Sequence, residues 1–85
     1  MFYVYAIYNL LHQKIYIGQT YDLDKRISEH NNINNLEHTY TRKFGPGWKL
    51  IYKEKLSTRA EALKREKQLK SYQGRLFIKK LITVA

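Results

Sequence analysis

The fold is decided by residues 2–18, which read Phe2-Tyr-Val-Tyr-Ala-Ile-Tyr8, then a polar turn, then Lys14-Ile-Tyr-Ile-Gly18. The first segment is rich in aromatic and β-branched residues and carries no charge, which predicts a strand with both faces largely covered. A turn at residues 9–13 sends the chain back, so we expect the second segment to form an antiparallel strand. Tyr5 and Tyr16 would then lie near each other on the sheet.

A third strand and three helices are expected after this hairpin. Residues 22–30 predict a helix with an acidic first turn, and residues 48–54 alternate as a strand. A capping box at residues 58–61 starts a helix that should run from Arg59 to about Tyr72, and a shorter helix should follow Gly74 over residues 76–82. The expected fold is therefore α+β, a small three-stranded antiparallel sheet flanked by three helices, in one domain over residues 1–85.

Charge and composition narrow the class of partner. Sixteen Lys and Arg against seven Asp and Glu give a net charge of +9, and the cations cluster in the last third of the chain. Such clustering favours a polyanionic partner over a merely solvated basic surface. There is no cysteine, so any metal must be held by oxygen or imidazole. No segment approaches the ~20 apolar residues of a membrane span, and we expect a soluble, cytoplasmic protein.

One carboxylate, Glu66, falls near the centre of the apolar stripe of the helix that begins at the capping box. The stripe consists of Ala62, Leu63, Leu69 and Gln73. An unpaired, ionised carboxylate is costly to bury, so Glu66 should be protonated, paired with one of the many basic residues, or bound to a metal ion. On this residue alone the ion pair is favoured.

Five positions, taken together, point to a known family. The triplet Tyr3-Val4-Tyr5 is followed by Tyr16-Ile17-Gly18, by Arg26 ten residues after Tyr16, by His30 one helical turn later, and by Glu66. In this order and spacing the chain resembles the GIY-YIG nuclease superfamily over nearly its whole length. Residues 39–42 and 61–70 also resemble its small, single-domain bacterial branch.

The resemblance implies a reaction and a role for each of these residues. Glu66 and water molecules would hold Mg²⁺ or Mn²⁺, Arg26 would contact the non-bridging phosphate oxygens, and His30 would assist from the same helix face. A triplet tyrosine, Tyr5 or Tyr16, would be the general base, helped by nearby cations that lower its pKa. The expected products are a 5′ phosphate and a 3′ hydroxyl.

Nucleic-acid contacts are expected on three further segments. Gln19 follows the second triplet, where many relatives carry lysine. The long loop of residues 31–47 supplies an aromatic ring and two cations, although that ring would equally suit packing on the sheet. The helix of Glu66 adds three lysines. The residues of the loop and of the helix are Tyr40, Arg42, Lys43, Lys64, Lys67 and Lys70.

The leading interpretation is a metal-dependent endonuclease that hydrolyses DNA in repair or recombination, associated with the nucleoid. A chain this short has little surface for reading a long sequence, so branched or single-stranded DNA is the expected substrate. The alternative is a non-catalytic DNA- or RNA-binding module with a degenerate nuclease site. A third interpretation is a protein-interaction domain that presents its basic face to an acidic partner.

Overall fold

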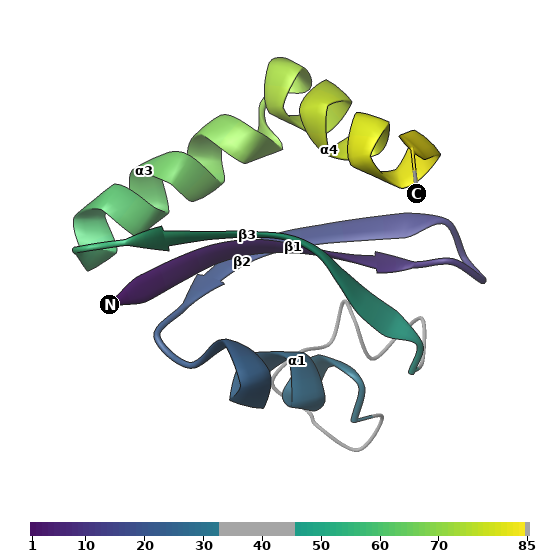
Figure 1. Cartoon of the computed structure of the whole chain (residues 1–85), viewed down its shortest axis with the longest axis horizontal. Helices are drawn as coiled ribbons and strands as arrows, with labels where there is room; N and C mark the ends of the chain where they lie inside the picture. The colour runs from purple at the N-terminus through teal and green to yellow at the C-terminus, as the bar shows by residue number, and fades with distance from the viewer. Residues whose placement is uncertain (33–45, 85) are drawn as a thin grey trace.

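A three-stranded sheet carries helices on both of its faces (Figure 1) in this computed structural model, which describes residues 1–32 and 46–84. The strands are β1 (Phe2–Asn9), β2 (Lys14–Thr20) and β3 (Trp48–Leu56), and β1 is central in the order β2-β1-β3. The helices within the described ranges are α1 (Leu23–His30), α3 (Arg59–Lys70) and α4 (Tyr72–Val84). The predicted α+β architecture is confirmed.

The register of the hairpin places the two triplets side by side. Strands β1 and β2 pair antiparallel, with Tyr5 opposite Gly18 and Ile7 opposite Tyr16. Because side chains alternate along a strand, Tyr5, Gly18 and Tyr16 share one face of the sheet. Strand β3 also pairs antiparallel with β1, through a register shift between Ala6 and Ile7.

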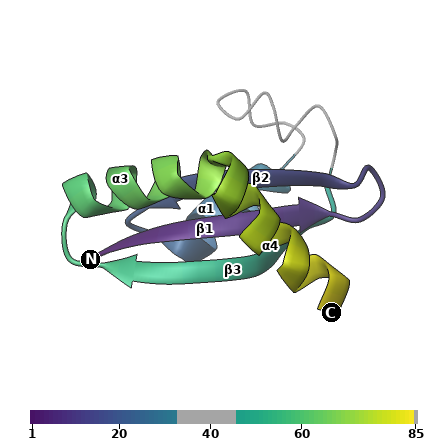
Figure 2. The ribbon, with the colours of Figure 1, turned by 90° about the horizontal axis from the view of Figure 1, so that it is seen from above.

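The central strand divides the core into two clusters, one on each face. Val4 and Ala6 belong to the cluster that includes residues of α3 and α4, whereas Tyr5 and Ile7 belong to the cluster that includes Leu23 of α1. Seen from above, α3 runs along β1 and β2, and α4 crosses the sheet towards β3 (Figure 2). The prediction that both faces of the first strand are covered is therefore confirmed.

Local capping chemistry fixes where two helices begin. The Asp22 side chain caps α1 by accepting a hydrogen bond from the backbone N–H of Lys25, at 3.2 Å. At the predicted capping box, the Thr58 hydroxyl accepts from the backbone N–H of Glu61 at 3.2 Å, and α3 begins at Arg59. Each cap satisfies a backbone donor that the first helical turn leaves unpaired.

The prediction for the last two helices was wrong at their junction. Helix α3 ends at Lys70 and α4 starts at Tyr72, so Gly74 lies inside α4 instead of preceding it. A Cβ atom on Gly74 would come within 2.4 Å of the Leu69 Cα. Glycine therefore allows the first turn of α4 to pack closely against the end of α3. Within the described residues, no helix combines the length and apolar character needed to cross a membrane.

Candidate active site

Three aromatic rings meet on the sheet face that α1 covers. The Tyr5 hydroxyl oxygen lies 2.7 Å from Nε2 of His30, the last residue of α1, and each of these residues is only 1% exposed. The ring of Tyr16, which is half-buried, has its centroid 4.8 Å from that of His30 and 6.3 Å from that of Tyr5. The expected proximity of the two tyrosines is confirmed, and the direct contact between Tyr5 and His30 is an addition that the sequence did not predict.

Gly18 is the reason why the two tyrosine rings can approach the strand so closely. A Cβ atom at this position would lie 2.8 Å from the Tyr5 hydroxyl oxygen and 3.0 Å from Cε1 of Tyr16. Any larger residue would have to displace one ring or the other. Strand β2 continues past this residue to Thr20, so the glycine serves close packing inside a strand.

The electrostatics of Tyr5 argue against its use as a base. Burial raises the pKa of the Tyr5 phenol well above its usual range, and the neighbouring Tyr16 raises that pKa further. Arg26 lowers the pKa of Tyr5, while Glu66 raises it, so both charged groups act on this phenol across the site. The expectation that nearby cations lower the tyrosine pKa is wrong for Tyr5, because desolvation outweighs the effect of Arg26.

Arg26 lies at the rim of the site, on the same face of α1 as the buried His30 and partly exposed. Its Nε atom is 3.4 Å from Oε1 of Glu29, and its side chain is 35% exposed. It lines a small hollow with Thr20, Asp22 and Glu29 among others. An exposed pair of this kind contributes only about 0–1 kcal/mol, so the guanidinium can exchange Glu29 for a phosphate group at little cost.

Glu66 lies on α3, the helix that contacts both β1 and β2. Ala62 and Leu69, on the same side of the helix, are buried, but Leu63 is 47% exposed and Gln73 belongs to α4. The predicted apolar stripe is thus narrower than expected, and the Glu66 side chain remains 20% exposed. Its Oε2 atom lies 2.7 Å from Nζ of Lys70, so the ion pair that the sequence favoured for this residue is present.

The predicted nucleic-acid contacts separate into distinct regions. Lys64, Lys67 and Lys70 line one shallow hollow along α3. Gln19 pairs with Val4 across the hairpin, so it belongs to the sheet face opposite the tyrosines. The three predicted residues of the loop, Tyr40, Arg42 and Lys43, lie outside the described residues.

Asn31 is a positioning residue that the sequence did not identify. It is the C-terminal cap of α1, and its Oδ1 atom accepts hydrogen bonds from the backbone N–H groups of Gly47 and Trp48, at 3.0 and 2.7 Å. Its Nδ2 atom donates to the Trp48 carbonyl at 3.1 Å. These bonds anchor the end of α1, and hence His30, to the start of β3. An asparagine directly after the predicted helix of residues 22–30 was the available signal in the sequence.

The side chains present suit a weakly held, hydrated cation. Among the described residues, no group of three or more His, Asp or Glu side chains could enclose a metal ion. Glu66 offers one partly exposed carboxylate, and Mg²⁺ commonly binds through one or two carboxylates while it keeps several water molecules. A cation at this position would have to replace the Lys70 ammonium group.

Comparison with known proteins agrees with this geometry. The chain matches the family model of the GIY-YIG catalytic domain over residues 1–80. It is 38% identical over 58 residues to a UPF0213 protein of Staphylococcus saprophyticus, covering 68% of this chain and 67% of the relative. UPF0213 proteins of Staphylococcus epidermidis and Staphylococcus aureus are 36% and 34% identical over the same length and the same shares of each chain.

No solved structure matches the chain with significance. The family model spans both triplets, the ring cluster on α1 and β2, and Glu66, so the match covers every residue on which the site was built. A GIY-YIG catalytic domain implies nuclease activity in general. By its sequence and its fold, this chain belongs to the GIY-YIG family.

Proposed function

We propose that the protein is a metal-dependent endonuclease that hydrolyses DNA phosphodiester bonds in repair or recombination. The observation that supports this most directly is the cluster of Tyr5, Tyr16 and His30, in which both tyrosine rings lie against Gly18 and the charges of Arg26 and Glu66 act on the Tyr5 phenol. We further propose that it prefers branched or single-stranded DNA, and that it acts on nucleoid DNA in the cytoplasm.

In this proposal the two tyrosines have different roles. Tyr16 is half-buried and lies on the edge strand β2, so its hydroxyl is the one that an attacking water molecule can approach. It acts as the general base that accepts a proton from this water molecule. Tyr5 stays protonated and holds His30 in place through the buried hydrogen bond.

Arg26 is proposed to bind the phosphate group that is attacked. A guanidinium can contact two non-bridging oxygens at once and can neutralise the charge that builds up on them in the transition state. The residue is already at the surface, and its only described ion pair is the one with Glu29 on the same helix. Substrate binding would replace that contact.

Glu66 is proposed to hold Mg²⁺ or Mn²⁺, together with water molecules. When bound, the ion supplies positive charge for the departing 3′ oxygen. The residue itself contributes a carboxylate whose position is fixed by the packing of α3, through buried Ala62 and Leu69 and through the ion pair between Arg65 and Glu54 at 3.0 Å.

The direct test is incubation of the protein with supercoiled, branched and single-stranded DNA, with Mg²⁺, with Mn²⁺ and with EDTA. Cleavage that requires the metal ion and is lost in Glu66→Gln would support the proposal. Glu61→Gln is the matched control, because it removes the same charge from the same helix and keeps a residue suited to the capping box. Equal loss in both variants, or cleavage in EDTA, would refute the role of Glu66.

A second function, nucleic-acid binding without catalysis, is favoured by one observation. The Glu66 carboxylate is already neutralised by Lys70 at 2.7 Å, as would suit a purely structural ion pair. A protein that binds DNA or RNA tightly but cleaves none of the substrates with either metal ion would establish this function. Equally tight binding to acidic proteins and to nucleic acids would favour the third interpretation, a protein-interaction domain with a basic face.

A further inference from the structure

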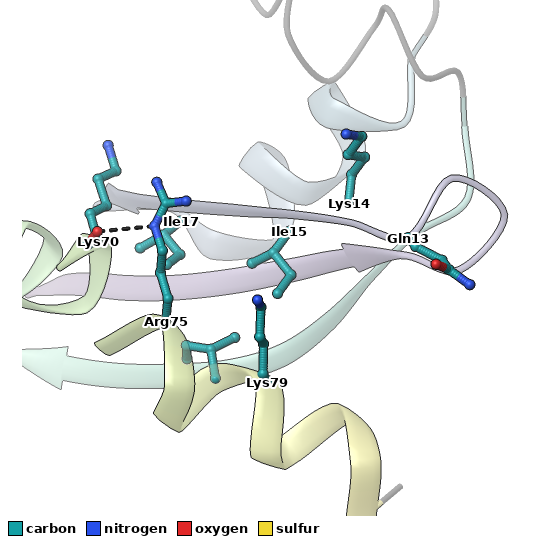
Figure 3. A pocket seen from close by; sticks show the side chains of 8 residues that line it. Gln13, Lys14, Ile15, Ile17, Lys70, Arg75 and Lys79 are labelled. Carbon is teal, nitrogen blue, oxygen red and sulfur yellow. Dashed lines mark hydrogen bonds between the residues drawn. The ribbon is translucent and has the colours of Figure 1, made fainter. Parts of the chain in front are cut away.

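A basic cavity lies on the opposite side of the sheet from the tyrosine cluster. Its volume is about 480 Å³, and it is enclosed by the hairpin turn, by β2 and by α4 (Figure 3). Ile15 and Ile17 line it from the sheet. They alternate with Tyr16 along β2, so they face the other way. The cavity is therefore separate from the tyrosine cluster, and it adjoins Glu66 through Lys70, which lines the cavity and pairs with that carboxylate.

Cations surround an apolar floor in this cavity. The floor consists of Ile15, Ile17 and Ile78, and the rim carries Lys70, Arg75 and Lys79. Lys14 also lines the cavity, but Figure 3 shows its ammonium group directed away from Ile15 and Lys79. None of the described residues that line the cavity is acidic. Lys70 is paired with Glu66, which does not line the cavity. A concave surface that carries several cations attracts anions and concentrates them near those cations.

Arg75 is fixed in a position where it can bind a ligand. Its Nε atom donates to the backbone carbonyl of Lys70 at 3.0 Å, which anchors the guanidinium at the junction of α3 and α4. Figure 3 shows its two terminal nitrogens directed away from that carbonyl. A guanidinium held by one N–H keeps its remaining donors available for the oxygens of a phosphate group.

The cavity continues into the basic surface of α3. Lys70 lines both the cavity and the shallow hollow that it shares with Lys64 and Lys67. The cations thus form a continuous series along two helices. A ligand with regularly repeated phosphates, rather than one isolated anion, matches such a series.

We propose that this cavity binds a sugar-phosphate unit of the DNA backbone, as a second contact for the substrate outside the active site. The proposal rests on the proposed function for the identity of the ligand. The phosphate would lie among Arg75, Lys79 and Lys70, and the C–H faces of the deoxyribose would pack on the isoleucines, which offer no hydrogen bonds. A DNA strand bound in this way passes along α3 and around the edge of β2.

The test compares two neighbouring lysines of α4. Lys79 lines the cavity whereas Lys80 does not, and both are exposed. Binding of a fluorescein-labelled DNA is measured by anisotropy in EDTA over a range of salt concentrations, for the wild type, Lys79→Gln, Lys80→Gln and Arg75→Gln. Cleavage with Mg²⁺ is measured in parallel on the same samples.

Lys79→Gln and Arg75→Gln should each weaken binding about threefold to tenfold at low salt and flatten the slope of log K against log salt by about 0.7 to 0.9. Lys80→Gln should change both quantities much less. Equal effects of Lys79→Gln and Lys80→Gln, or wild-type binding by Arg75→Gln, would overturn the proposal. The proposal would also be overturned if an acidic polypeptide displaced DNA at the same concentration of charges and if Lys79→Gln weakened binding of that polypeptide to the same extent.

The outcome for the cavity is independent of the outcome for catalysis. A protein that shows the specific loss with Lys79→Gln but cleaves no DNA would refute the nuclease and retain the cavity as a binding site. A protein that cleaves DNA but binds it equally well in all four forms would retain the nuclease and refute the cavity. Absence of DNA binding by the wild type would refute both.

Discussion

Removing one buried hydroxyl tests the proposed division of roles between the tyrosines. In Tyr5→Phe the ring still fills its place on β1, but Nε2 of His30 loses its partner at 2.7 Å, and both residues are 1% exposed. Leaving a buried polar group unsatisfied costs about 1–3 kcal/mol. For a domain of this size, 1 kcal/mol shifts the melting temperature by about 4–8 °C. We therefore expect Tyr5→Phe to melt roughly 4–24 °C below the wild type.

Tyr16→Phe is the matched comparison. The hydroxyl of the half-buried Tyr16 can be replaced by water, so the loss of stability should be smaller than in Tyr5→Phe. Its effect on cleavage should be larger, because it removes the proposed base. The two quantities are measured separately, the melting temperature by circular dichroism and the cleavage rate at a temperature where both variants are folded.

Alkaline pH provides an independent check on Tyr5. Its folded-state pKa is raised by burial. The folded state therefore favours the protonated phenol, and this contribution to stability is intact below the unfolded pKa of about 10. It is lost as the pH rises from there through the raised folded pKa. The stability difference between wild type and Tyr5→Phe should shrink over that range.

Two results would refute this reasoning. The first is a Tyr5→Phe protein that melts with the wild type, because the hydrogen bond to His30 would then contribute nothing. The second is a folded Tyr5→Phe protein that is inactive while Tyr16→Phe cleaves normally, because Tyr5 would then be the base despite its burial.

Further substitutions test the remaining parts of the site. Glu66→Ala should abolish metal-dependent cleavage and leave DNA affinity equal or higher, with a stability loss of about 1 kcal/mol because the Lys70 end of its ion pair is half-exposed; a mutant that unfolds would contradict this. Arg26→Ala should raise the barrier by about 2–4 kcal/mol and weaken ground-state binding much less, whereas equal losses in kcat/KM and affinity would make Arg26 only a phosphate contact. Gly18→Ala should cost about 1–3 kcal/mol of stability, since the new methyl group would press on the Tyr5 hydroxyl, and an unchanged melting temperature would disprove that contact. Replacement of three lysines of α3 by glutamine, at Lys64, Lys67 and Lys70, should flatten the salt dependence of DNA binding. This dependence is measured by anisotropy.

The hairpin and the helix starts could be predicted because their signals are local. An alternating, uncharged segment followed by a polar turn specifies two paired strands, and a threonine three residues before a glutamate specifies a capping box. The junction near Gly74 was mispredicted for the opposite reason. Glycine usually interrupts a helix, and only the close approach of Leu69 from the preceding helix explains its presence inside α4. That contact is tertiary and leaves no pattern in the sequence.

The candidate site was predicted as a set of residues but not as an arrangement. Spacing placed Tyr5 and Tyr16 near each other, and Arg26 and His30 on one helix face, because each pair depends on a single element or a single hairpin. The contact of His30 with Tyr5 depends on how α1 packs on the sheet, as does the anchoring of α1 by Asn31. Contacts such as these, which join separate secondary-structure elements, could not be predicted from the sequence.

The two triplet tyrosines differ because one is on a central strand and the other on an edge strand. Tyr5 on β1 lies between two paired strands and beneath α1, and the same burial that strengthens its hydrogen bond to His30 raises its pKa. Tyr16 lies on β2, which is an edge strand among the described residues, and it is half-buried, so part of the residue is accessible to solvent and to a substrate. Proton transfer at neutral pH needs an accessible phenol, and rigid placement of a histidine needs a buried one. The strand order assigns these two requirements to different tyrosines. For this reason we expect Tyr5→Phe to lower stability more than Tyr16→Phe does, and Tyr16→Phe to lower the cleavage rate more than Tyr5→Phe does.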